Sequence, residues 1–327
     1  MASSRIRLIF LFAWSGLSLL AQSGLAVVEK KAGKVGFYTL EGQRTGEVKV
    51  GAFPHEMAFS PDHRLLYVTD NGMLWMTDKG EGGNTISIID VASRKKTGVI
   101  DLGNNRRPHG LAVLPGTGEI LVTIENPYGL LRVDPAAKKV VRRYEAGGES
   151  PHMVMLGAHA GTAWVSNSGS GTVAVLDLTS GSIHSQIPTG KNTQGCVMSR
   201  DGRTVYVTNN VSNSISVVDA ASRKVKREIN TGEGPARVFL SPDERTLLYN
   251  LQAGSAMGFA DTSSGKEAAR IALPGQPLSL SLSSDGKTAF LGIQDSDKIV
   301  VISVLERKIL RVFDTPAGAG PDSIEPL

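Results

Sequence analysis

Cysteine, aromatic residues and long apolar runs are all scarce in this sequence. Cys196 is the single cysteine among 327 residues, so no disulfide can form within the chain. Aromatic residues make up only 6% of the chain and charged residues 20%, while hydrophobic residues reach 41%. These proportions exclude a multi-span membrane protein and a disordered polyampholyte. The chain must therefore fold around an aliphatic core that has no covalent cross-link.

Several motifs of enzymes and cofactor proteins are also missing. The sequence contains no Cys-x-x-Cys-His for covalent haem, no Gly-x-Ser-x-Gly and no complete phosphate-binding loop of the type Gly-x-x-x-x-Gly-Lys-Ser/Thr. The recurring aspartates fall at turns, where short side chains bind backbone donors, so no carboxylate pair for glycoside cleavage can be assigned. Serine-triad hydrolysis and nucleotide binding through a phosphate-binding loop therefore have no support.

The first 26 residues differ from the rest. Arg5 and Arg7 precede an apolar run from Leu8 to Leu20, and small residues follow it up to Ala26. The run is shorter than the roughly 20 residues that a membrane-spanning helix needs, and this order is typical of a secretory signal peptide. We predict a signal peptide over residues 1–26, a periplasmic, secreted or cell-surface location, and no transmembrane segment after cleavage. An uncleaved anchor is the alternative.

The charge balance of the mature chain argues against nucleic acid as a partner. The signal segment contains two arginines and no acidic residue, so the net charge of +4 falls to about +2 without it. Basic hairpins such as Arg94–Lys96 lack interleaved aromatic residues for stacking on bases. We expect no nucleic-acid binding and a monomeric protein.

A phrase repeats along the remaining chain. Its clearest copies are Tyr67–Asp70, Trp164–Asn167 and Tyr206–Asn209, each after a polar turn and before a second alternating run. The residues that close this second run recur at intervals of 42 to 44: Asp90, Asp134, Asp177, Asp219, Asp261 and Ser303. Each period contains four short segments with the alternation of β-strands. A four-stranded unit of this length is typical of a propeller blade.

The residue count after position 26 corresponds to seven such units. Six complete units occupy residues 51–318, and the seventh is split between three strands in residues 26–50 and an innermost strand in residues 321–327. We predict an all-β fold for residues 27–327, a seven-bladed β-propeller with four-stranded antiparallel blades. The N- and C-terminal strands would share one blade, which closes the ring and leaves no open edge.

The repeat phrases carry a family resemblance. Tyr206–Asn209, Ser60–Asp62 and Pro108–Gly110 resemble the YVTN repeat family of seven-bladed β-propellers, over essentially the whole mature chain. Some members of that family resemble bacterial surface antigens, and others are exported propellers associated with pyrroloquinoline-quinone-dependent catabolism. Members serve as binding modules, cofactor platforms and occasionally enzymes. The resemblance therefore implies the fold and leaves the function open.

Comparison of the blades predicts one site. Positions at the start of the innermost strand, beside the central channel, are equivalent in all seven blades: His55, His109, His152, Gln194, Ala236, Leu278 and Asp322. Ring closure brings Asp322 next to His55, so five polar residues form one arc. A concave opening with a few convergent polar groups is the usual ligand site of such a fold.

The three histidines of this arc allow two interpretations. Converging neutral imidazoles at His55, His109 and His152 would form a zinc or copper site, with Asp322 or Gln194 orienting a ligand or accepting a proton. Alternatively, Pro-His is repeat consensus, and each histidine packs on its blade and bonds a backbone carbonyl. The other histidines, His63, His159 and His184, are expected away from this site.

Blade one carries an insertion on the same face. The interval from His55 to His109 is 54 residues, whereas the next is 43, and the extra residues lie at about Met73–Gly83. Trp75 in this loop would belong to a lid or partner surface, or it would fold back onto the blade. Arg106 and Arg107 would make the rim positive and suit an anionic ligand, such as a carboxylate or a quinone cofactor.

Three functions follow as hypotheses. The leading one is an exported, non-catalytic or auxiliary module that binds a small molecule, a metal, a redox cofactor or a periplasmic protein. The second is a metal-dependent lactonase, lyase or oxidoreductase with the three histidines as ligands. The third is adhesion through the Trp75 loop. Cys196 is predicted to be a buried, unreactive residue.

Overall fold

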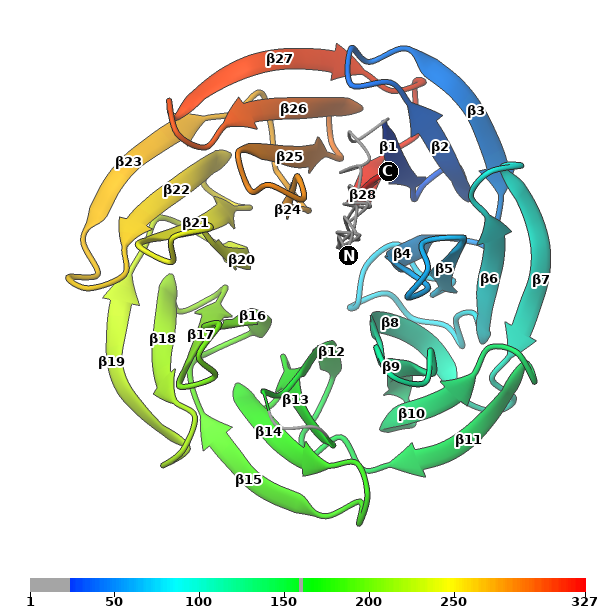
Figure 1. The fold of residues 1–327 in the computed structure, drawn as a ribbon, viewed down its shortest axis with the longest axis horizontal. Coiled ribbons are helices and arrows are strands. Elements are labelled where there is room, and N and C mark those ends of the chain that lie inside the picture. Colours follow the sequence, from blue (N-terminus) through cyan, green and yellow to red (C-terminus); the bar gives the residue numbers. More distant parts are fainter. Residues whose placement is uncertain (1–23, 159–160) are drawn as a thin grey trace, which may run out of the picture.

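The computed structural model describes residues 24–158 and 161–327. All regular structure in these residues is β: 28 strands form seven four-stranded sheets. The sheets stand around a central axis like the blades of a propeller (Figure 1). Every neighbouring pair of strands within a sheet is antiparallel, for example β5 with β6 and β17 with β18. The predicted fold class is confirmed.

Each blade contains four strands that follow one another from the axis outward. Blade 1 has β4 (Pro54–Phe59), β5 (Leu65–Asp70), β6 (Thr85–Asp90) and β7 (Lys95–Asp101); blade 2 has β8 (Arg106–Val113), β9 (Ile120–Asn126), β10 (Tyr128–Asp134) and β11 (Lys139–Tyr144); blade 3 has β12 (Pro151–Leu156), β13 (Thr162–Asn167), β14 (Thr172–Asp177) and β15 (Ile183–Pro188). Blade 4 has β16 (Thr193–Met198), β17 (Thr204–Asn209), β18 (Ser214–Asp219) and β19 (Lys224–Asn230); blade 5 has β20 (Pro235–Leu240), β21 (Thr246–Leu251), β22 (Ala256–Asp261) and β23 (Glu267–Ala272); blade 6 has β24 (Ser281–Leu282), β25 (Thr288–Ile293), β26 (Lys298–Ser303) and β27 (Lys308–Asp314). Blade 7 has β28 (Pro321–Pro326), β1 (Leu25–Glu29), β2 (Lys34–Tyr38) and β3 (Arg44–Lys49).

The seventh blade is built from both ends of the described chain, as predicted. Its strand order is β28-β1-β2-β3, and Val27 of β1 pairs with Ile324 of β28. Leu25 and Ala26 already belong to β1 and are fully buried, so the blade includes the last two residues of the predicted signal peptide. Residues 1–23 of that segment lie outside the described residues, and the signal peptide remains a prediction.

Aliphatic side chains between neighbouring blades form the core. Ile86 and Ile100 of blade 1 pack with Ile120 and Ile124 of blade 2, and all four are fully buried. Burial of apolar surface stabilises the fold by roughly 25 cal/mol per Å². No helix in the described ranges is long and apolar enough to cross a membrane.

Hydrogen bonds between neighbouring blades fix the position of the innermost strands along the propeller axis. The Thr69 hydroxyl of β5 donates to the His109 carbonyl at 2.9 Å, and the Thr123 hydroxyl of β9 donates to the His152 carbonyl at 2.8 Å. Thr208 of β17 donates in the same way to the Ala236 carbonyl. The threonine of the repeat phrase therefore positions the first residues of the next blade's innermost strand, which is where the predicted site lies.

Candidate ligand-binding site

A pocket of about 320 Å³ lies on the propeller axis, at the face where the innermost strands begin. All seven predicted ring residues line it: His55, His109, His152, Gln194, Ala236, Leu278 and Asp322. Trp75 of the blade-one insertion also lines it. Lys30, which the sequence reasoning missed, contributes a further side chain and is itself almost completely buried, with a relative exposure of 3%.

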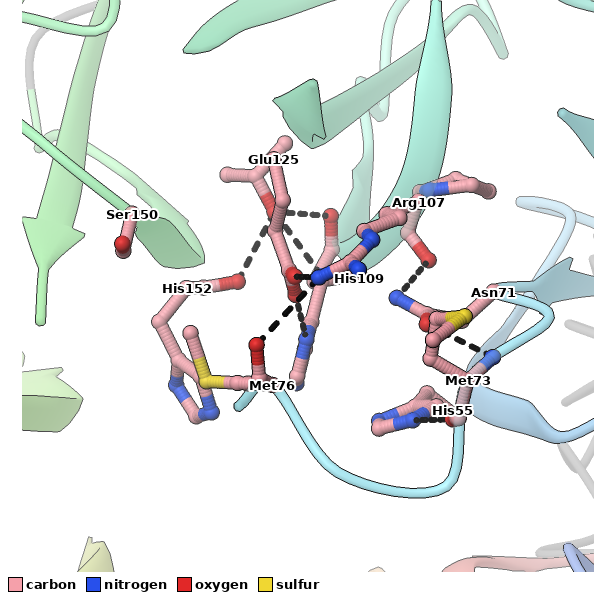
Figure 2. A network of polar contacts seen from close by, with 12 residues as sticks. His55, Asn71, Met73, Met76, Arg107, His109, Glu125, Ser150 and His152 are labelled. Atoms are coloured by element: carbon pink, nitrogen blue, oxygen red, sulfur yellow. Dashed lines mark hydrogen bonds and ion pairs between the residues drawn. The ribbon is translucent and has the colours of Figure 1, made fainter. Parts of the chain in front are cut away.

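The three imidazoles of the arc pack against one another. The ring centroids of His55 and His109 lie 4.4 Å apart, and those of His109 and His152 lie 4.2 Å apart. His55 Nε2 donates to the Met73 carbonyl at 3.1 Å, so its Nδ1 is the acceptor that faces Lys30 Nζ at 3.4 Å. His109 Nδ1 lies 2.6 Å from Glu125 Oε1 (Figure 2). The rings therefore form a packed row, each with its own partners.

This arrangement does not support the three-histidine metal site. In the part of the chain that the structure describes, no group of three or more His, Cys, Asp or Glu side chains is placed to hold a metal ion. Both nitrogens of His55 are engaged, one of them by the Lys30 ammonium, which repels a cation. The alternative interpretation, histidines packed on their blades and bonded to backbone carbonyls, describes His55 well.

Burial keeps two of the imidazoles neutral. It lowers the pKa of His55 well below its usual value, and the positive charge of Lys30 lowers it further. Burial likewise lowers the pKa of His152, followed by the effects of His109 and Arg237. Lys30 Nζ forms an ion pair with Asp322 Oδ2 at 3.0 Å. Asp322 and His55, which were predicted to be neighbours, therefore both contact Lys30.

Lys30 and Glu125 occupy equivalent positions in their blades. In each blade, one residue of the second strand pairs with a residue near the start of the innermost strand, and the position in question comes directly after it in the sequence. In the other five blades this position is occupied by Asn71, Ser168, Asn210, Gln252 and Gln294. Five blades therefore have a neutral residue here, while blade 7 has a cation and blade 2 an anion. A comparison of the residues that follow each repeat phrase could have found both.

Arg107 does not line the central pocket, contrary to the prediction that it forms a binding rim. Its guanidinium donates to the carbonyls of Met76 at 3.2 Å, Asp78 at 2.6 Å and Gly80 at 2.9 Å. These contacts hold the insertion against blade 2 (Figure 2). Trp75 of the same loop lines the pocket, and its ring centre lies 5.6 Å from Lys30 Nζ. The arginine acts through the loop and not through direct contact with a ligand in this pocket.

Replacing Arg107 with alanine should release this loop. The variant loses three charge-assisted hydrogen bonds to one segment, so we expect proteolysis within residues 73–83 to become at least about tenfold faster, corresponding to about 1.4 kcal/mol. Limited proteolysis with mass spectrometry measures the effect. Arg106→Ala is the matched control, since Arg106 has only a 3.6 Å ion pair with the exposed Glu81. Equal cleavage rates in both variants would contradict the assignment.

An ion pair crosses the channel beneath the pocket. Glu56 lies on β4 of blade 1 and Arg237 on β20 of blade 5, on opposite sides of the axis (Figure 1). Arg237 Nη2 contacts Glu56 Oε1, and the two side chains are only 12% and 11% exposed. Arg237 also lines the pocket. The pair forms a charged floor below the imidazole row.

A model of the YNCE-like beta-propeller family matches residues 156–245 of the sequence. The match covers less than a third of the chain and agrees with the predicted resemblance to YVTN-repeat propellers. The chain is a seven-bladed β-propeller that resembles the YVTN repeat family. No curated protein matches its sequence.

Several solved structures resemble this propeller in fold. A functionally unknown protein from Desulfotomaculum acetoxidans has a TM-score of 0.76 and 13% identity, over 93% of this chain and 98% of that one. The periplasmic gluconolactonase PpgL of Pseudomonas aeruginosa has a TM-score of 0.73 and 17% identity, over 92% and 98%. The dihydro-heme d1 dehydrogenase NirN, in complex with DHE, has a TM-score of 0.66 and 16% identity, over 93% and 75%. Such low identities establish only a shared fold.

The remaining predicted residues of the propeller lie away from the pocket. The His63 ring stacks on Phe59 with centroids 4.9 Å apart, and His184 Nε2 lies 3.5 Å from Asp177 Oδ2. His159 lies outside the described residues. Burial raises the pKa of the Cys196 thiol to about 12, so the thiol remains protonated near neutral pH.

Proposed function

We propose that this protein is an exported binding module whose central pocket takes a small hydroxylated carboxylic acid or its lactone. The observation that carries the proposal is the composition of the pocket wall. Imidazoles lie on one side and amide side chains such as Gln194, Asn210 and Gln252 on the other, and Trp75 also lines the pocket. Amides and imidazoles both donate and accept hydrogen bonds, which suits a ligand with several hydroxyl groups.

The charges of the wall favour a carboxylate or a polarised carbonyl. Lys30 and Arg237 contribute two positive charges, and Asp322 contributes one negative charge. A planar guanidinium and an ammonium bind carboxylate oxygens through charge-assisted hydrogen bonds. The pocket volume of about 320 Å³ is at the low end for ligand sites, which suits a ligand of monosaccharide size.

The comparison structures are consistent with this ligand class. PpgL is a periplasmic gluconolactonase, and its substrate is the lactone of a hydroxylated acid. The fold likeness at 17% identity carries no substrate by itself, and the pocket wall supplies the independent support. The signal-peptide pattern of residues 1–26 supports export.

Isothermal titration calorimetry with gluconate, galactono-1,4-lactone and glucose tests the proposal. We expect saturable binding of the acid or the lactone, with glucose at least about tenfold weaker, since it has no carboxyl group. The double variant Lys30→Met/Asp322→Asn should weaken acid binding about 10- to 100-fold, because it removes a charged donor without leaving its partner unpaired. Lys31→Met is the control, since Lys31 lies outside the pocket wall and contacts the Gln294 carbonyl. Absence of binding by both acid and lactone would overturn the proposal.

A further inference from the structure

We propose that His109 and Glu125 form a general-base dyad that hydrolyses a small carboxylic ester, lactones included, in the central pocket. The inference rests on the proposed ligand pocket and adds an activity to it. A carboxylate that orients an imidazole and stabilises its protonated form is the arrangement that makes histidine an effective base. The sequence alone favoured a non-catalytic module, because of the YVTN resemblance and the missing catalytic motifs.

The position of Glu125 is the first argument. In blades 1 and 3 the equivalent residue is neutral and donates to the next blade: Asn71 Nδ2 bonds the Pro108 carbonyl at 3.2 Å, and the Ser168 hydroxyl bonds the Thr193 carbonyl at 2.7 Å. A carboxylate cannot donate, so Glu125 gives up this structural bond. It turns to His109 Nδ1 of its own blade instead. A departure from the repeat that loses a stabilising contact is the kind of exception that marks a functional site.

The burial of the pair is the second argument. The side chains of His109 and Glu125 are 3% and 5% exposed, and their 2.6 Å contact is close to the short end for a charge-assisted hydrogen bond. Arg107 Nη1 lies 3.8 Å from Glu125 Oε2 and keeps a positive charge beside the carboxylate (Figure 2). Among the described residues, His109 Nε2 has no hydrogen-bond partner, while the ring lines the pocket. This nitrogen is the available base.

The neighbouring groups are suited to the rest of the reaction. His55 contacts the Lys30 ammonium, and its ring packs against that of His109, so a cation lies one ring away from the base. No carboxylate contacts His152, whose Nδ1 is buried without a partner in the described structure. Only one of the three imidazoles therefore contacts a carboxylate, and the Lys30 ammonium, which also lines the pocket, is the cation that would stabilise negative charge on a carbonyl oxygen.

The hydrolytic step balances with water as the only co-reactant. His109 Nε2 takes a proton from water as the water oxygen forms a bond to the carbonyl carbon. The carbonyl electron pair moves onto its oxygen, where Lys30 stabilises it. When the tetrahedral intermediate collapses, the bond from carbon to the alkoxy oxygen breaks, and the imidazolium returns its proton to that oxygen. The products are the carboxylic acid and the alcohol, joined in one molecule when the substrate is a lactone.

Kinetics of the full chain with p-nitrophenyl acetate, γ-butyrolactone and glucono-δ-lactone test the dyad. We expect hydrolysis above the buffer rate for at least one probe, and a fall in kcat/KM of about 10²- to 10⁴-fold in Glu125→Gln. Glutamine keeps the length of the side chain and its amide oxygen can still accept from His109 Nδ1, so this variant should fold. His109→Gln should be equally impaired, and the double variant no worse than either, because the two residues act as a unit. His63→Asn on the opposite face is the control.

The pH profile separates a base from a structural residue. The wild-type rate should rise with pH through one ionisation that disappears in His109→Gln. The charged or titratable groups around this imidazole are Glu125 and Arg107 of its own blade, together with His55, Lys30, Glu56, His152 and Arg237. Calorimetric binding of acid or lactone without hydrolysis of any probe would overturn the dyad and leave the proposed function intact. Hydrolysis that Glu125→Gln retains at the wild-type rate would also overturn it.

Discussion

Replacing Arg237 with methionine is expected to lower the free energy of unfolding by about 3–5 kcal/mol at pH 8. The guanidinium is the counter-charge of Glu56 across the channel, and both side chains are nearly buried. Loss of one partner leaves a buried carboxylate uncompensated, which costs far more than loss of an exposed pair. Burial already raises the pKa of Glu56, and the positive charge of Arg237 opposes this rise. Urea denaturation of both proteins measures the difference.

The pH dependence of this loss identifies its cause. At pH 5 the isolated Glu56 carboxyl of the variant can take a proton, so the loss should be smaller than at pH 8. The double variant Arg237→Met/Glu56→Leu removes both charges and should recover most of the stability, because apolar residues can replace a buried pair at little cost. A loss that is equal at both pH values, or a double variant as unstable as the single one, would argue against a buried ion pair.

Glu325 should make the wild-type protein less stable as pH rises from about 4.5 to 8. Burial, and after it the Glu56 carboxylate, raises the pKa of this carboxyl from 4.5 to about 8. A group with a raised pKa in the folded state stabilises the fold below the pKa of the unfolded chain. Its contribution is lost as pH rises through the folded value, because the unfolded chain releases the proton first. A difference of one between the folded and unfolded pKa corresponds to about 1.4 kcal/mol of stability.

Glu325→Gln tests this linkage. The variant should match the wild type below pH 4 and become more stable than the wild type toward pH 8, by up to several kcal/mol. Chemical denaturation at intervals between pH 4 and 8.5 gives the two curves. Glu306→Gln is the control, since Glu306 lies exposed in a turn of blade 6 beside Lys308. Parallel curves for wild type and Glu325→Gln would show that this carboxyl does not carry the pH dependence.

The blade count, the terminal closure and the ring of site positions could be predicted from sequence because they depend only on repeat phase. Equivalent positions in a repeat take equivalent places in a propeller, so His55, His109 and His152 had to lie at the same height around the axis. The pairing of β1 with β28 followed from the need to close the ring. The period of the repeat, applied to all seven blades, was sufficient for all three predictions.

The chemistry of the site could not be predicted in the same way. Lys30 directly follows β1 and Glu125 lies on β9, whereas the histidines lie on the innermost strands, and only the strand register brings the two sets together. Arg107 was expected at the rim, but the carbonyls of the blade-one insertion bind it, and no repeat pattern describes that loop. The sequence could not decide between the two interpretations of the histidines for a related reason: the direction of each imidazole depends on its individual partners, which differ from blade to blade.

The most direct test of the account is a ¹⁵N NMR measurement of the histidine side chains, with and without zinc. The account predicts that His109 carries its proton on Nδ1 toward Glu125 and His55 on Nε2 toward Met73, and that equimolar zinc leaves these signals unchanged. Added acid or lactone should shift the His109 Nε2 signal. Stoichiometric zinc binding that moves the signals of His55, His109 and His152 together would contradict it.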